Sequence, residues 1–231
     1  MGAELMPAGD AMKIRQMAAV LAVHVMLGPS AWAAETAAAR AENVWGQAFV
    51  QLADAIPEPL NTDDALQEGA LVRTEYRSGV VLKFRDDSTL TIGEDTRARI
   101  LAYRYQTESD VMALRVLSGA FRFVSGLIAR SRHDQVRVVT PVATIGIRGT
   151  HFGGEVGEDS ARIVLLEPED GRPSAIEVSN EFGAVQIEEP GFGTEIPDAF
   201  SPPSAPRRMR LDNVQHLMRN VGRVPRLRRV D

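Results

Sequence analysis

Residues 70–103 read ALVRTEYRSGVVLKFRDDSTLTIGEDTRARILAY, and their period of two decides the fold class. Apolar side chains at alternate positions share one face, and polar side chains occupy the other. The apolar set is Val80, Leu82, Phe84, Leu90 and Ile92. Such alternation is typical of half-buried β-strands. Turn residues interrupt it at Arg77-Ser78-Gly79, Asp86-Asp87-Ser88 and Gly93-Glu94-Asp95, so the stretch predicts short strands joined by tight turns.

The same pattern continues toward the C-terminus. Leu114 and Val116 precede a predicted turn at Ser118-Gly119, and Phe121 and Phe123 follow it. More short strands are expected up to residue 191, with turns at Glu169-Asp170-Gly171 and Glu181-Phe182-Gly183. Roughly ten strands at this spacing predict an all-β barrel, sandwich or solenoid. Periodicity alone does not choose between these architectures.

Residues 140–154, TPVATIGIRGTHFGG, combine apolar alternation with four glycines. A dinucleotide-binding loop needs G-x-G-x-x-G between a strand and a helix, and a P-loop ends in G-K-[ST]. Neither motif is present, and no helical pattern follows whose N-terminus could hold a phosphate. The stretch therefore predicts a strand and its corner, with Ala143, Ile145 and Ile147 facing the core.

Three further residues of this stretch carry separate expectations. Gly146 lies within the strand, which predicts that another group packs closely over it. Gly149 can adopt positive φ and turn the chain sharply. Arg148 stands at the strand end, where its guanidinium could bond carbonyls or a carboxylate. Whether Arg148 braces the fold or binds a partner is left open.

These segments resemble the FecR-domain family, an exported bacterial family. The resemblance rests on four segments in order: 66–100, LRVLSGAFRFVSG (114–126), VRVVTP (136–141) and the signature TPVATIGIRGTHF (140–152). It is strong over residues 66–157 and fades to about 191. It implies an all-β domain built as a short twisted β-solenoid or as stacked β-hairpins. It also implies a periplasmic or cell-surface setting.

The signalling members of that family relay iron-siderophore occupancy from an outer-membrane receptor to a cytoplasmic sigma factor. They carry a cytoplasmic anti-sigma segment of many tens of residues and then one spanning helix. Here sixteen residues precede an apolar run of eleven, which is shorter than the ~20 residues that a spanning helix needs. The chain therefore looks like a stand-alone exported member.

The N-terminus carries the marks of a secretory signal peptide. Lys13 and Arg15 precede the apolar run over 17–27, and the small-residue pattern Ala31-Trp32-Ala33 follows. These are the three regions of a cleaved signal, with cleavage expected after Ala33 and a membrane anchor as the weaker alternative. We expect an exported, soluble mature protein in the periplasm or at the cell surface.

The remaining chain divides into four predicted parts. The signal peptide is expected at 1–33, and Met12 is an alternative start. The four parts that follow it are a leader with first strands (34–65), the FecR-like β domain (66–196), a Pro/Ser linker (197–206) and a basic tail (207–231). Residues 34–44 are rich in alanine, which favours either a short helix or a disordered leader.

Charge is distributed unevenly along the sequence. Residues 207–231 hold eight arginines and two aspartates, a balance of +6, so the rest of the chain carries −11. Leu211, Val214, Met218 and Val221 follow helical spacing, which predicts a short basic amphipathic helix. Two interpretations stay open: the tail docks on the acidic body or frays, or it lies on an anionic membrane surface. Nucleic acid is not expected as a partner.

The sequence offers no catalytic constellation. Cysteine is absent, so neither a disulfide framework nor a thiolate metal site is expected. His133, His151 and His216 form no metal motif; His151 could meet Asp134 or Glu155 at a corner, but a solvated turn histidine is the favoured interpretation. The acidic pair at Asp86 lacks the six to eight oxygens of a calcium site and predicts a hairpin turn. We expect no metal and no cofactor.

The sequence thus predicts a non-catalytic binding module of the bacterial envelope. Its partner is expected to be an envelope protein, a glycan or a small ligand, and the partner-binding residues are not assigned. A first alternative is a periplasmic component of iron-responsive FecR-type signalling that lacks its own anti-sigma and spanning segments. A second alternative is an envelope hydrolase.

Overall fold

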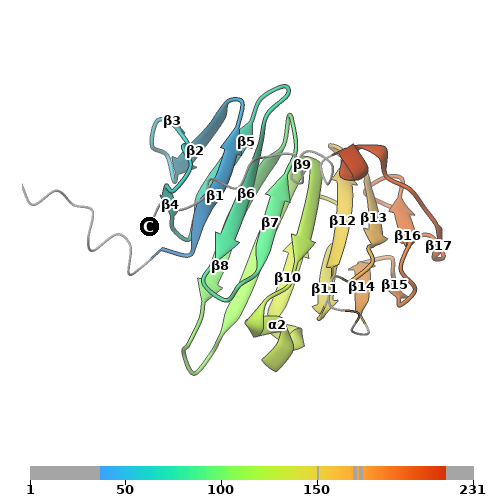
Figure 1. Ribbon diagram of the computed structural model, residues 1–231. Coiled ribbons are helices and arrows are strands. Elements are labelled where there is room, and N and C mark those ends of the chain that lie inside the picture. Colours follow the sequence, from blue (N-terminus) through green and yellow to red (C-terminus); the bar gives the residue numbers. More distant parts are fainter. Residues whose placement is uncertain (1–36, 150, 169–170, 172–173, 217–231) are drawn as a thin grey trace, which may run out of the picture.

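The computed structural model describes residues 37–149, 151–168, 171 and 174–216, and its strands form two facing layers (Figure 1). The first layer, called sheet A, has the order β4 (Ala65–Leu66), β1 (Ala39–Trp45), β6 (Gly79–Phe84), β7 (Thr89–Ile92), the second half of β9 (Val111–Val124), β12 (His151–Val156), β13 (Ala161–Leu165), β16 (Phe192–Ile196) and β17 (Arg207–Arg208).

The second layer, called sheet B, shares β9 with the first. Its order is β3 (Glu58–Pro59), β2 (Ala48–Leu52), β5 (Ala70–Thr74), β8 (Arg97–Arg104), the first half of β9, β10 (Val136–Val139), β11 (Thr144–Arg148), β14 (Ala175–Asn180) and β15 (Gly183–Ile187). A short helix α2 (Leu127–Ser131) and a 3₁₀ turn η1 (His133–Gln135) connect β9 to β10.

The hairpins of the chain are distributed over both layers, and β10 and β11 form one of those in sheet B. β6 and β7 pair in sheet A, β8 and β9 in sheet B, β12 and β13 in sheet A, and β14 and β15 in sheet B. All of these pairs are antiparallel, whereas β9 and β10 pair in parallel. The predicted all-β fold is confirmed, and it takes the form of stacked hairpins.

Strand β9 passes from one layer to the other at Gly119. Ser118 pairs with Arg97 in sheet B, and Gly119 pairs with Val156 in sheet A. Gly119 has a φ of +95°, which L side chains rarely adopt, and the side chain of Thr96 fills the space that a Cβ would need. The predicted turn at Ser118-Gly119 is therefore wrong: one long strand bends there and belongs to both sheets.

The core lies between the layers and contains the residues that the alternation predicted. Val80, Leu82, Phe84, Leu90 and Ile92 are all at most 2% exposed. Three phenylalanines occupy the centre where β9 meets β12. The rings of Phe121 and Phe123 each lie 5.7 Å from that of Phe152. Burial of each such ring contributes roughly 1.5–3 kcal/mol.

The alanine-rich segment forms a strand. Residues Ala39–Trp45 are β1, which pairs with β6 from Ala39 opposite Phe84 to Trp45 opposite Gly79. Ala39 and Ala41 face the core at 3% and 0% exposure. The expectation of a short helix or disordered leader is wrong over 39–44, because pairing with a core strand overrides the helix propensity of alanine.

The segment predicted as a Pro/Ser linker lies beside β16. The hydroxyl of Thr194 donates a 2.7 Å hydrogen bond to the Ser204 carbonyl, and the backbone N–H of Glu195 donates to the Ser204 hydroxyl at 3.0 Å.

The signal peptide predicted at 1–33 lies outside the described residues. In the described part, no helix is long and apolar enough to cross a membrane.

The first part of the basic tail docks on the outer face of sheet A. Residues 212–216 are helical, and Leu211 and Val214 are 2% and 1% exposed against Val164 of β13. Arginines of the tail pair with the body: Arg207 with Glu195, and Arg208 with Glu189 at 3.5 Å. This arrangement agrees with docking on the acidic body. Met218 and Val221 lie outside the described residues.

Candidate functional site

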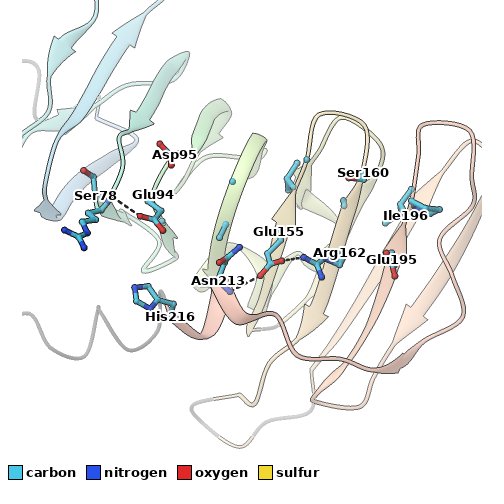
Figure 2. A pocket seen from close by; sticks show the side chains of 18 of the residues that line it. Ser78, Glu94, Asp95, Glu155, Ser160, Arg162, Glu195, Ile196, Asn213 and His216 are labelled. Carbon is cyan, nitrogen blue, oxygen red and sulfur yellow. Dashed lines mark hydrogen bonds and ion pairs between the residues drawn. The ribbon is translucent and has the colours of Figure 1, made fainter.

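A groove of about 980 Å³ crosses the outer face of sheet A, at the end of its strands where the β7–β8 and β12–β13 turns lie. Figure 2 shows Glu94 and Asp95 at one end, Glu155, Arg162 and Glu195 at the other, and Asn213 and His216 in front. The full lining is Trp45, Arg77, Ser78, Gly93, Glu94, Asp95, Gly119, Ala120, Glu155, Val156, Gly157, Ser160, Ala161, Arg162, Glu195, Ile196, Pro197, Asn213 and His216.

The floor of the groove follows one row of paired residues across the sheet. Trp45 is opposite Gly79, and Gly93 donates its N–H to the carbonyl of Ala120. Ala120 is in turn opposite Glu155, which is opposite Arg162, which is opposite Glu195. The middle of the row consists of Gly79, Gly93 and Ala120, which have no side chain or only a methyl group. The groove is therefore hollow between an aromatic end and a charged end.

Trp45 lies against the backbone of the neighbouring strand. A Cβ placed on Gly79 would come within 2.1 Å of the indole ring atom Cζ2, so only glycine leaves room for the ring there. The ring is partly exposed and lines the groove. A partly exposed indole that rests on a glycine offers an aromatic surface to a ligand, and such surfaces attract cations and apolar groups.

The carboxylates of the groove fall into two kinds. Glu155 pairs with Arg162 and also accepts a 3.0 Å hydrogen bond from the Asn213 backbone N–H. Glu195 pairs with Arg207. These two charges are neutralised within the fold.

The carboxylates of the β7–β8 turn differ. Glu94 accepts a 2.9 Å hydrogen bond from the backbone N–H of Arg77, but it forms no ion pair within the described residues. Asp95 is exposed, and in the same part of the chain it forms neither a side-chain hydrogen bond nor an ion pair. The groove is therefore lined by one aromatic side chain and by two carboxylates that form no ion pair among the described residues.

The front wall of the groove belongs to the docked tail segment. A Cβ on Gly153 of β12 would lie 2.7 Å from the Val214 methyl carbon Cγ1, so the absence of a side chain at Gly153 allows this docking. Asn213 and His216 then reach the groove from the same short helix. The wall thus depends on one glycine of the sheet.

The signature strand lies in sheet B, away from the groove lining. Ala143, Ile145 and Ile147 are buried in the core, and Gly149 has a φ of +58°, so both predictions are confirmed. The expected close packing over Gly146 is wrong, because the nearest atom to a Cβ there would be 3.9 Å away. Arg148 is exposed, and its side chain forms no hydrogen bond or ion pair in the residues that the structure describes.

His151 is buried rather than solvated. It is 4% exposed at the start of β12 and accepts a 2.5 Å hydrogen bond at Nε2 from the Arg122 guanidinium. Its Nδ1 lies 2.6 Å from the carbonyl of Glu167, to which it donates. The two contacts fix the ring as the Nδ1–H form and make His151 a bracing residue of the outer face. The expected turn histidine is therefore wrong.

The acidic turn at Asp86 is structural. Asp86 is fully buried, accepts hydrogen bonds from the Ser88 hydroxyl at 2.8 Å and the Ile128 N–H at 3.3 Å, and thereby holds α2 against the β6–β7 hairpin. The Tyr103 hydroxyl accepts a 2.8 Å hydrogen bond from the Asp86 N–H, and burial raises the pKa of Tyr103. Over the described ranges, no cluster of metal-ligating side chains occurs.

Sequence reasoning did not find the groove residues. Glu94 and Asp95 were predicted only as turn residues, and Trp45 lay in a segment without a clear period. The feature that could have indicated the groove is the pair Trp45 and Gly79, but these residues become neighbours only when β1 pairs with β6. That pairing is not visible in the local sequence pattern.

The fold is a two-layer β module with a groove that crosses the strands of sheet A. Residues 70–169 match the model of the family described as "FecR protein". The predicted resemblance is thereby confirmed. The match begins at β5 and ends just after β13, so Trp45, Glu195, Asn213 and His216 reach the groove from outside the matched residues.

Two solved structures resemble the fold. Both are of a protein described as a "putative anti-sigma factor" from Parabacteroides distasonis ATCC 8503, with 12% identity and a TM-score of 0.49. The alignments cover 64% of this chain and 64% and 63% of those chains, so this chain spans less than two thirds of their length. No curated protein matches the sequence.

Proposed function

We propose that this chain is an exported FecR-type module of the bacterial envelope that works by binding, without catalysis. The groove on sheet A receives an arginine- or lysine-bearing segment of an envelope protein. The observation that carries the proposal is that Trp45 lines the same groove as Glu94 and Asp95, two exposed carboxylates that form no ion pair among the residues that the structure describes.

The chemistry of that site favours a cationic side chain. A guanidinium or ammonium group gains about 0.5–2 kcal/mol over an indole face. It gains further from a carboxylate within reach, and the gain increases when water is excluded by the walls of a groove. Ser160 lines the same groove and adds a hydroxyl for a peptide backbone, whereas the Ser78 hydroxyl is already bonded to Gln47 and Tyr76.

A second candidate is a part in ligand-linked signalling across the envelope. The match of residues 70–169 to the FecR family model favours it. In this arrangement the groove holds another protein of the signalling path. The two candidates use the same surface and differ in the identity of the partner.

The test is capture from envelope extracts with the full chain and two matched variants. Glu94→Gln/Asp95→Asn removes two charges from the groove, and Glu177→Gln/Glu181→Gln removes two from exposed positions of β14 and its turn in sheet B. We expect one identified protein whose retention falls about tenfold with the groove variant only, since each of the two contacts is worth roughly 0.7 kcal/mol. Equal retention by all three forms, or release by added glycan fragments, contradicts the proposal.

A further inference from the structure

Four adjacent strands of sheet B concentrate positive charge. Strands β8, β9, β10 and β11 follow one another across the middle of this sheet, and none of them contains an aspartate or a glutamate. Their residues in sheet B include six arginines, which are Arg97, Arg99, Arg104, Arg115, Arg137 and Arg148. The chain as a whole has a formal net charge of −5, so this part of the sheet runs against the balance of the sequence.

Four of these arginines, here called the arginine stripe, project from the outer face of sheet B: Arg99, Arg115, Arg137 and Arg148. Their neighbours along each strand point the other way and belong to the core, namely Ala98, Ile100, Leu114, Val116, Val136, Val138 and Ile147. Arg99 is half-buried, and the other three are exposed. The alternation of each strand therefore sends one guanidinium group to the solvent side of the sheet.

The strand register arranges the stripe as an oblique line. Arg99 is directly opposite Arg115. Arg137 is opposite Ala113, two residues back along β9 from Arg115. Arg148 is displaced by two further residues in the same direction, because Gly146 is the residue opposite Arg137. Three strand spacings and four residues of displacement give the line a length of about 20 Å.

The arginine stripe has no counter-ion in the part of the chain that the structure describes. None of its four side chains forms a hydrogen bond or an ion pair there. Arg99 and Arg115 are nevertheless opposite each other, which places their Cβ atoms about 5 Å apart. Like charges in this position destabilise a sheet. The pair therefore does not stabilise the fold, and an anion that lies across it is attracted by both charges.

Carboxylates border the stripe on two sides. Glu75 follows β5 and pairs with Arg73 at 3.1 Å. Glu177 of β14 is exposed and lies opposite Gly146, next to the Arg148 end of the stripe. A flat anionic membrane on this face would meet these carboxylates together with the arginines, whereas a single chain along the line mainly meets guanidinium groups. The arrangement thus favours a linear polyanion.

The position within the sheet distinguishes between two kinds of linear polyanion. Each strand of the stripe is paired on both sides, so an acidic peptide cannot add to it as a further strand. A polysaccharide needs no backbone hydrogen bonds from the protein, and its rigid sugar rings lose less conformational freedom than a disordered peptide. Its carboxylate or phosphate groups accept paired hydrogen bonds from guanidinium groups.

We infer that the arginine stripe is a second binding site of this chain and that its ligand is a linear anionic polysaccharide. The carboxylate or phosphate groups of the polysaccharide lie along the four guanidinium groups. The stripe and the groove of sheet A are on opposite faces of the fold, so the inference goes beyond the proposed function and does not depend on it. The chain then has one site for a basic segment and one for an acidic polymer.

Calorimetric titration of the full chain with oligogalacturonate, whose sugars each carry one carboxylate, tests the inference. The uncharged methyl ester of the same oligosaccharide is the control ligand. Arg115→Gln/Arg137→Gln removes two charges from the stripe, and Arg40→Gln/Arg208→Gln removes two exposed charges from sheet A. We expect the affinity for oligogalacturonate to fall about tenfold in the stripe variant and to stay within about twofold in the control variant. The ester is expected not to bind.

Two further measurements separate binding from a structural role. Glu177→Gln is expected to raise the affinity about twofold, because it removes a carboxylate beside Arg148. Without ligand, the unfolding midpoint of Arg115→Gln/Arg137→Gln is expected to equal or exceed that of the wild type, since the variant relieves the like-charge pair of Arg99 and Arg115.

Four results overturn the inference. They are no binding of oligogalacturonate, equal loss of affinity in the two double variants, a lower unfolding midpoint of the stripe variant with unchanged affinity, and tighter binding of poly-glutamate or phosphatidylglycerol vesicles than of oligogalacturonate. Glu94→Gln/Asp95→Asn in the groove is expected to leave the binding of oligogalacturonate unchanged. Failure of partner capture together with normal binding of the sugar contradicts only the proposed function, and the converse result contradicts only the site on sheet B.

Discussion

At the residue scale, Gly119 and Gly191 have similar backbone torsions but different surroundings. Their φ angles are +95° and +82°. A Cβ on Gly119 would meet the Thr96 backbone at 2.6 Å, whereas a Cβ on Gly191 would have no neighbouring atom within 4 Å among the described residues. We expect Gly119→Ala to lower the free energy of unfolding by about 3 kcal/mol and Gly191→Ala by about 1 kcal/mol. Urea denaturation of both variants measures this difference. Equal losses would show that the layer crossing of β9 does not depend on Gly119.

The buried phenol of Tyr103 gives the fold a dependence on alkaline pH. Burial raises its pKa above the ordinary value of ~10, so the folded state holds this proton more tightly than the unfolded state. The stabilisation is complete below pH 10 and is lost as the pH rises toward the higher pKa of the folded state. We expect the unfolding free energy of the wild type to decline above pH 10, and that of Tyr103→Phe to decline less. Parallel curves for the two proteins would contradict the assignment.

At the element scale, docking of the tail segment on β12 depends on Gly153. Gly153→Ala would place a methyl group 2.7 Å from Val214 and 3.0 Å from the carbonyl of Phe121, so we expect a loss of about 1–3 kcal/mol. Release of the segment is measured by tryptic cleavage at Arg207, Arg208 and Arg210. Gly146→Ala is the control, because its Cβ has 3.9 Å of space. Unchanged cleavage in Gly153→Ala would show that the segment does not require this glycine.

Most strands between residues 70 and 103 were predictable, because each buries one face and so alternates strictly. Two elements were not. Ser118-Gly119 has the composition of a turn, but β9 uses it to bend between layers, and only the pairing with β8 and β12 reveals that. The alanines of β1 favour helix locally, and the partner strand β6 reverses that preference.

At the scale of the whole molecule, the candidate site was hidden because no single stretch contains it. Gly79, Gly93 and Ala120 are unremarkable in sequence and form a hollow floor only when three strands lie side by side. The sequence did not predict that His151 is buried, because its contacts come from Arg122 of β9 and from Glu167 after β13, which are distant in the sequence. Arg148, the most conspicuous polar residue of the signature, lies on the other sheet.

The central claim is that the groove on sheet A recognises basic segments. The most direct measurement is calorimetric titration of a synthetic peptide with the sequence of residues 217–231 onto the chain ended at His216, which keeps every residue of the described fold. We predict one site whose affinity falls about tenfold in Glu94→Gln/Asp95→Asn, stays within about twofold in Glu177→Gln/Glu181→Gln, and weakens with added salt. No binding, or equal weakening in both variants, would contradict the claim.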